Sequence, residues 1–292
     1  MSVFFNAQHE LRSGWKVLIY ILLLLVSTII VGNFLLPLLI DTSVIGDNDI
    51  EFLAISVGVE LIAAVIALLF MARFVDRVPA STFGFPLRVG GGREFLRGAA
   101  IAAAMLVLVV ICCMLFGDLS IQRNTGATSM SILSMAAVLL AAAAFEELVF
   151  RGYPLQTLMK GMGQWPAVLL MSTLFGLAHM NNPNASTLGI INTVLAGLLL
   201  CLGYLETRRL WLPYGLHFLW NAGLGLILGF SLSGINTASL WVTTVKGLDI
   251  LLGGEYGPEG GIAGTITFVA AMGFFLNRWK KRNHKQQNQE TQ

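Results

Sequence analysis

Residues 131–159 read SILSMAAVLLAAAAFEELVFRGYPLQTLM, a stretch that is apolar enough to cross a membrane yet carries two glutamates and an arginine. A helix needs about 20 predominantly apolar residues to cross the hydrocarbon core of a bilayer. Ionisable side chains inside such a span cost ~2.5–3.5 kcal/mol each on insertion scales, which makes each of them a candidate for function. This stretch therefore predicts a membrane helix and a place for chemistry within it.

The rest of the chain has the same apolar character. The 292 residues are 56% apolar and 12% charged, with a mean hydropathy of +0.76, whereas soluble proteins average roughly 25% charged residues. This composition argues against a water-soluble globule. Eight apolar stretches are candidate membrane helices, at about 15–40, 52–74, 95–116, 131–159, 164–180, 187–205, 211–230 and 262–276. We predict an all-α fold, a polytopic membrane helix bundle with about eight transmembrane helices.

The distribution of basic residues predicts the orientation of the spans. If Arg12 and Lys16 are cytoplasmic and the spans alternate, cytoplasmic segments collect 16 of the 18 Lys and Arg residues, as the positive-inside rule requires. Only Arg123 and Lys246 then lie on the opposite side. Both termini are expected in the cytoplasm. Because no organelle signal is evident, we expect a bacterial plasma membrane.

Three segments describe the expected organisation. Residues 1–130 hold the first three helices and a basic cytoplasmic loop, and residues 131–230 hold a core of four helices. Residues 231–292 hold a Gly-rich outer loop, the last helix and a basic cytoplasmic tail that we expect to be disordered. No polar stretch is long enough to bury a core of its own. Function must therefore lie among the helices.

The charged residues of the fourth span divide into two roles. Glu147 and Arg151 are four residues apart, so they share a helix face and can neutralise one another. Glu146 is rotated by about 100° from Glu147 and can face a cavity instead. A desolvated glutamate can act as a general base near neutrality. For the Glu147–Arg151 pair, a purely structural role is equally compatible with the sequence.

Two further spans carry a histidine each. His179 closes the fifth span, and Gly176 lies one turn before it, where a partner helix can approach closely. In the seventh span His217 and Asn221 are four residues apart and project from one face.

Residue counts give an approximate depth in the membrane for each of these side chains. At 1.5 Å per residue, Glu146 and His179 lie roughly 21 and 26 Å from the cytoplasmic end of their spans. The same count places His217 and Asn221 at only roughly 10 and 16 Å. Linear counting thus brings the first two residues together better than the last two.

These residues form three motifs, Glu-Glu-x-x-x-Arg, Phe-x-x-x-His and His-x-x-x-Asn, in this order on three spans. The set resembles the CPBP intramembrane protease family, which includes the type II CAAX prenyl endopeptidases and the bacterial Abi or bacteriocin-processing proteins. The likeness covers roughly residues 145–221, and every motif position is filled. It implies an intramembrane endopeptidase that hydrolyses a peptide bond in a membrane-associated or lipidated peptide or protein.

The resemblance also implies catalytic roles for six positions, namely Glu146, Glu147, Arg151, His179, His217 and Asn221. Glu146 would activate water with help from His179. His217 and Asn221 would stabilise the oxyanion. Glu147 and Arg151 would orient the helix and the base.

Metal dependence is left open by the sequence. A metalloprotease would hold Zn²⁺ through Glu146, His179 and His217, with water in the fourth position. A metal-free site would use Glu146 as the base, with His217 and Asn221 as donors to the developing charge. The residues are compatible with both.

Two functions of other classes compete with hydrolysis. A transporter could relay protons through the same intramembrane carboxylates and histidines, although broken helices and paired repeats are not evident. A catalytically silent membrane scaffold or immunity protein is the other alternative. Glu60, in the second span, has no assigned role. Asn192, in the sixth, could bridge helices or line the same cavity, and the sequence favours the structural role. The expected partners are a membrane-associated peptide or protein and the lipid bilayer. No nucleic-acid partner is expected, because the sequence contains no nucleic-acid motif.

Overall fold

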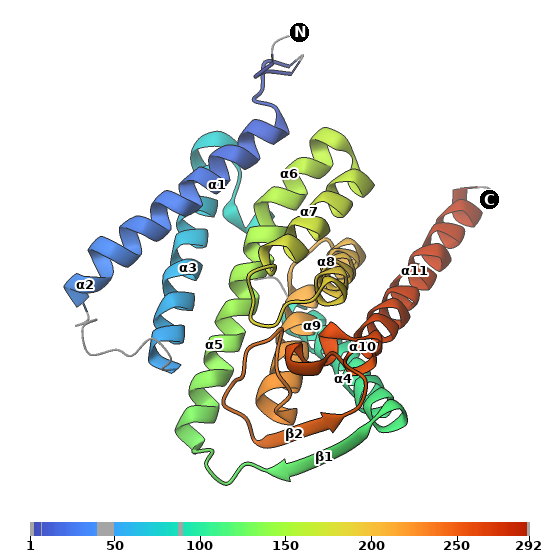
Figure 1. Cartoon of the computed structure of the whole chain (residues 1–292). Helices are drawn as coiled ribbons and strands as arrows, with labels where there is room; N and C mark the ends of the chain where they lie inside the picture. The colour runs from blue at the N-terminus through green and yellow to red at the C-terminus, as the bar shows by residue number, and fades with distance from the viewer. Residues whose placement is uncertain (1–2, 7, 40–49, 87–89, 291–292) are drawn as a thin grey trace. The chain divides into compact units, whose positions relative to one another are not determined.

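The computed structural model is predominantly helical (Figure 1). It describes residues 3–6, 8–39, 50–86 and 90–290. Among these residues, six helices are long and apolar enough to cross a membrane, at Ser13–Leu38, Ile50–Val75, Gly91–Phe116, Ser129–Met162, Thr187–Thr207 and Ile262–Lys281. The chain is therefore an integral membrane protein with an all-α, polytopic fold.

The expected number of eight spans is not confirmed, because two of the expected spans are short. The fifth is α7 (Gln164–Ala178), with 15 residues. The seventh is α9 (Trp211–Asn221), with 11 residues, followed by a π-helical segment, η6 (Ala222–Leu228). Two glycines in the left-handed region bound these elements, Gly163 before α7 and Gly229 after η6, where a residue with a Cβ would be strained.

The prediction of a disordered tail was wrong for the residues that the structure describes. The last helix, α11 (Ile262–Glu290), continues through the basic segment. Lys, Arg, Gln and Glu are good helix formers, and extending an existing helix costs far less than nucleating a new one. The basic segment therefore prolongs the last membrane helix.

Contacts divide the chain into two compact units. The first comprises residues 1–91 and 128–171, and the second comprises residues 92–127 and 172–292. The boundary runs through α7, so the core expected at 131–230 contributes to both units. The three predicted segments follow the order of the sequence, whereas the two units are defined by contacts. The division into three segments therefore stays a prediction.

The first unit is built on α1 (Ser13–Ile30), α3 (Ile50–Phe70), α5 (Ser129–Glu147) and α6 (Tyr153–Met162). Figure 1 shows α1 and α3 running side by side. The face of α3 that packs in this unit carries Ala63, Ala64 and Ala67, all fully buried, because small side chains let membrane helices approach closely. Short segments extend these helices, namely η1 (Val31–Leu35), α2 (Leu36–Leu39) and η3 (Met71–Val75).

The connector that follows α3 packs against its own unit instead of extending into solvent. It contains one 3-10 turn, η4 (Ala80–Thr82). Phe83 is buried, with its ring centroid 4.9 Å from that of Tyr153. Lys16 lies 2.6 Å from Asp76 and ties α1 to the same connector.

The second unit contains α4 (Gly91–Phe116), α8 (Thr187–Thr207), α9 and α11. Helices α4 and α9 cross at two glycines. A Cβ on Gly98 would collide with the Leu212 carbonyl oxygen, and a Cβ on Gly215 would collide with that of Phe95. Such a crossing requires glycine because the two backbones are in contact.

A small β-sheet, which the sequence analysis did not predict, lies in the second unit (Figure 1). Strand β1 (Asp118–Arg123) pairs antiparallel with β2 (Trp241–Lys246). The sequence of β2, WVTTVK, is rich in β-branched residues that favour strands. Its partner lies more than a hundred residues away in the sequence, so no hairpin signal marks the pair.

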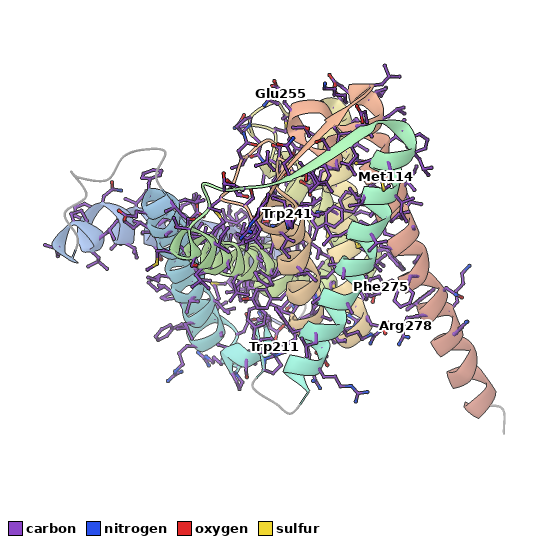
Figure 2. All side chains as sticks on the ribbon, turned by 90° about the horizontal axis from the view of Figure 1, so that it is seen from below. Met114, Trp211, Trp241, Glu255, Phe275 and Arg278 are labelled. Atoms are coloured by element: carbon purple, nitrogen blue, oxygen red, sulfur yellow. The ribbon has the colours of Figure 1, made fainter. Side chains whose placement is uncertain are left out.

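The remaining part of the loop at 231–261 folds into short turns. These are α10 (Asp249–Leu252), η7 (Gly254–Tyr256) and η8 (Pro258–Gly260). Figure 2 shows Glu255 of this loop at one end of the second unit, with Trp211 and Arg278 toward the other end. The loop and the basic ends of α9 and α11 are thus separated along the unit.

Candidate functional site

The glutamate pair of the first motif lies where α5 stops being a regular helix. Glu146 and Glu147 are the last two residues of α5, and a π-helical segment, η5 (Leu148–Gly152), follows. Pro154 explains the change, because proline has no N–H to donate and its ring clashes with the carbonyl four residues earlier. Local π-helix is frequent at functional sites. The proline was a visible signal of this break inside the fourth span.

The predicted pairing of Glu147 with Arg151 is observed. Arg151 Nη1 donates to Glu147 Oε1 at 3.1 Å, and neither side chain is exposed. Gln156 supports the same turn, since its Nε2 donates to the carbonyl oxygens of Arg151 and Phe83 at 3.3 and 3.2 Å. A buried ion pair that is also held through its backbone has a fixed position.

Glu146 is half-buried and has an acidic neighbour that sequence reasoning left unassigned. Its charge interacts with that of Glu60 on α3. Glu60 also lines a groove of about 430 Å³ between α1 and α3, together with polar side chains that include Asn33 and Ser56. This interaction arises because α3 packs on α5, a contact that spacing along the sequence does not reveal.

His179 lies in the second unit, directly after the last residue of α7. Its Nδ1 is 2.7 Å from the carbonyl oxygen of Phe175. A carbonyl oxygen only accepts hydrogen bonds, so Nδ1 carries the proton of the neutral ring and Nε2 is the basic nitrogen. The backbone of α7 thereby selects the tautomer of His179.

The close helix approach that we predicted at Gly176 is confirmed. A Cβ at this position would collide with Val194 and would lie 3.1 Å from the Ile190 carbonyl oxygen, both on α8. The absence of a side chain lets α8 touch the last turn of α7. This contact fixes the end of the helix from which His179 follows.

Phe175 lies between the two motif histidines, His179 and His217. Its ring centroid is 4.8 Å from that of His179 and 6.1 Å from that of His217, the latter in an edge-to-face arrangement. The linear depth count, which separated these histidines by about 16 Å, was therefore wrong. It assumed full-length, parallel spans, whereas α7 and α9 are both short.

Helix α9 carries the last motif. His217 is buried, at 6% exposure, and Asn221 lies one helical turn further along, half-buried. The Asn221 amide makes no hydrogen bond to any other described residue, so its N–H groups can serve as donors to a ligand. The predicted common face of these two residues follows from the regular helix at 211–221.

The donor groups of the three motifs include candidate metal ligands. Within either unit, the described residues include no group of three or more His, Cys, Asp or Glu that could hold a metal ion. The predicted zinc set takes Glu146 from the first unit and His179 and His217 from the second. One carboxylate and two imidazoles are a suitable donor set for Zn²⁺, and a carbonyl bonded to the other ring nitrogen is typical of a metal-binding histidine. Zinc stays a prediction.

The motif region matches one protein family. Residues 128–223 match the family described as type II CAAX prenyl endopeptidase Rce1-like. No curated protein and no solved structure matches the chain. The matched segment contains all six residues of the three motifs, and it begins at Thr128, which caps the first turn of α5. Residues 128–223 are therefore similar to the Rce1-like type II CAAX prenyl endopeptidases, within the CPBP family of intramembrane proteases.

Proposed function

We propose that this protein is an intramembrane endopeptidase that hydrolyses a peptide bond in a membrane-associated or lipidated peptide or protein. The observation that carries the proposal is the family match, because it spans all three motifs with every position filled. The family makes peptidase chemistry the leading expectation. The geometry of each motif is suited to one part of that chemistry.

Glu146 is the proposed general base, which takes a proton from the attacking water. Its neighbour Glu147 is neutralised by Arg151, so Glu146 is the carboxylate of the pair better suited to proton transfer. His179 assists as an acceptor through Nε2, because its Nδ1 is bound to the backbone. A proton taken at either group can then pass to the leaving amine.

His217 and Asn221 are the proposed donors to the oxyanion that forms when water attacks the carbonyl. The buried imidazole of His217 and the half-buried amide of Asn221 lie one turn apart on α9. Preorganised donors of this kind contribute about 2.7–4 kcal/mol each to lowering a barrier of acyl transfer. Glu146 belongs to the first unit and His217 to the second.

Zinc is compatible with this proposal and is not required by it. If Zn²⁺ binds, Glu146, His179 and His217 would hold it, and the ion would supply Lewis-acid polarisation and a more acidic water. Metal analysis of the purified protein decides between the two forms. Activity should follow zinc content through chelation and readdition if the metal takes part, and should be unaffected by chelation if it does not.

The first test is proteolysis by purified protein in liposomes that contain membrane-associated peptides, with and without a prenyl group. We expect Glu146→Gln and His179→Ala to reduce cleavage by about 10²–10⁴-fold, the usual contribution of general acid–base catalysis. Glu51→Gln is the matched control, because Glu51 is an exposed glutamate of the same unit. Cleavage by Glu146→Gln at the parent rate would refute the assignment.

The competing functions predict different results in the same liposomes. Proton-coupled flux that depends on Glu146 would favour a transporter. Membrane peptides that differ between parent and Glu146→Ala cells identify substrates. If the same peptides accumulate in both kinds of cell, a silent scaffold is favoured. We further propose a bacterial plasma membrane with both termini cytoplasmic, which protease protection of terminal tags checks directly.

A further inference from the structure

The outer loop contains a buried carboxylate that the proposed mechanism does not use. Glu259, in η8, is only 7% exposed. Trp220 Nε1 donates to its Oε1 at 2.7 Å. The backbone N–H and the hydroxyl of Ser233 donate to its Oε2 at 2.9 and 2.7 Å. Both oxygens of the carboxylate are thus bound, one to α9 and the other to the loop that follows η6.

The same network reaches the residue that follows α7. The Ser233 carbonyl oxygen accepts a hydrogen bond from Asn182 Nδ2 at 3.1 Å. The backbone N–H of Asn182 in turn donates to the His179 carbonyl oxygen at 3.1 Å. A continuous chain of hydrogen bonds therefore runs from His179 through Glu259 to Trp220, entirely within the second unit.

Asn192 fastens this network to two more helices. It is fully buried on α8, and its Nδ2 donates to the backbone carbonyl oxygens of Glu259 and Gly261 at 2.7 and 2.8 Å. Its Oδ1 accepts from Thr265 of α11 at 2.7 Å. The helix bridge expected for Asn192 is thus observed, and it holds the peptide segment around Glu259 in place.

Trp220 lies on the helix that carries the proposed oxyanion donors. It follows His217 by three residues and directly precedes Asn221. Its indole is buried and packs on Phe268 of α11, with ring centroids 5.2 Å apart. Near the middle of α9, Gly215 lies against the backbone of α4. The helix is therefore held at two points, and the bond to Glu259 restrains its rotation about its own axis.

A small rotation of α9 would matter for catalysis. Side-chain atoms lie about 5–6 Å from a helix axis, so a rotation of about 10° displaces them by about 1 Å. Misplacement by about 1 Å can slow an enzyme about 10²-fold. A hydrogen bond that fixes this rotation can therefore control the rate without touching substrate.

The choice of glutamate at this position also calls for an explanation. A buried carboxylate is costly unless it is fully hydrogen-bonded. Here three donors offset the cost, and the nearby N-terminus of α11 favours a negative charge. A carboxylate accepts at both oxygens at once, whereas an amide would present a donor to one of these partners. The Glu259 carboxylate thus binds α9 through one oxygen and the loop after η6 through the other.

We propose that Glu259 is a positioning residue that sets the orientation of α9, and so of His217 and Asn221, relative to the end of α7 at His179. This inference rests on the proposed peptidase function for its effect on rate. The inference assigns a role to the outer loop at 231–261. In the second unit this loop binds both α9, which carries His217 and Asn221, and the turn after α7, which carries His179.

The test measures kcat and KM of peptide cleavage for Glu259→Ala, Glu259→Gln and Trp220→Phe. We expect kcat to fall about 10²-fold in Glu259→Ala and less in the two milder variants, with KM changed by less than about 2-fold. A variant that combines Glu259→Ala with Trp220→Phe should be no slower than Glu259→Ala alone, because both changes break the same interaction. Glu255→Gln is the matched control, since Glu255 is exposed in the same loop (Figure 2).

A second measurement does not depend on activity. In protein labelled with ¹³C-histidine, the His217 ring signal is identified by its loss in His217→Ala. We expect this signal to shift in Trp220→Phe and Glu259→Gln and to stay in place in Glu255→Gln. If the parent cleaves no peptide, the peptidase function fails and this signal alone decides the positioning role. Parent kcat in Glu259→Gln and Trp220→Phe, an unmoved His217 signal, or a loss confined to thermal stability would overturn the inference.

Discussion

The buried pair formed by Glu147 and Arg151 gives a quantitative test of the first motif. Replacing Arg151 by Met would leave the Glu147 carboxylate in a site where neither side chain is exposed, without the bond that now measures 3.1 Å. Removing one partner of a buried pair costs about 3–5 kcal/mol, because the remaining charge stays desolvated. We expect Arg151→Met to lower the free energy of unfolding by about that amount.

The double variant separates stability from function. Replacing both charges, in Glu147→Leu with Arg151→Met, removes the desolvated charges together and should return the stability to near that of the parent. If the pair also orients Glu146, activity stays low in this stable double variant. Recovery of both stability and activity would mean that the pair has no role beyond its own neutralisation.

Equilibrium unfolding in mixed detergent micelles, followed by circular dichroism, measures these differences. Arg123→Met is the matched control, because Arg123 is exposed on β1, and surface changes usually stay within about 0.5 kcal/mol. The reasoning is refuted if Arg151→Met loses less than about 1 kcal/mol, or if the double variant is as unstable as the single one.

Further predictions concern packing and polar bridges in the second unit, and each is checked by the same unfolding assay. Gly176→Val should cost about 1–3 kcal/mol by overpacking against Val194, and an unchanged transition would show that α8 does not touch this turn. Gly273→Ala is its control and should be neutral or stabilising by up to about 1 kcal/mol, since its Cβ would meet no atom within 4 Å. Asn192→Ala should cost at least about 1–3 kcal/mol, because the two carbonyl oxygens that it bonds become unsatisfied. Stability equal to the parent would mean that water replaces the amide.

Much of the fold follows from local sequence properties. The apolar stretches predicted where the helices begin to within a few residues, because burial of the backbone in lipid leaves helix as the accessible structure. Spacing of four residues predicted the Glu147–Arg151 pair and the common face of His217 and Asn221 for the same reason, since i and i+4 are neighbours on a helix. Gly176 was likewise recognisable as a point of close approach.

Other features depend on contacts between residues that are far apart in the sequence. The β1–β2 pair joins strands that no short turn connects. Glu60 interacts with Glu146 only because α3 packs on α5. The depth count failed for His217 because it assumed full-length spans, whereas α7 and α9 are both short. Pro154 was visible in the sequence, but its effect on the turn after Glu147 needed the structure.

The sequence by itself determined that the chain is a membrane helix protein, and that its costly polar residues form the three motifs of one protease family. Hydrophobicity and helical periodicity are local quantities, so they can be read along the chain. Only the tertiary structure decided which nitrogen of His179 is basic, how α9 is held, and that the loop carboxylate of Glu259 is buried. The proton position on His179 follows from a bond within the last turn of α7. The hold on α9 and the burial of Glu259 arise where distant segments satisfy one another's hydrogen bonds, which no local pattern encodes.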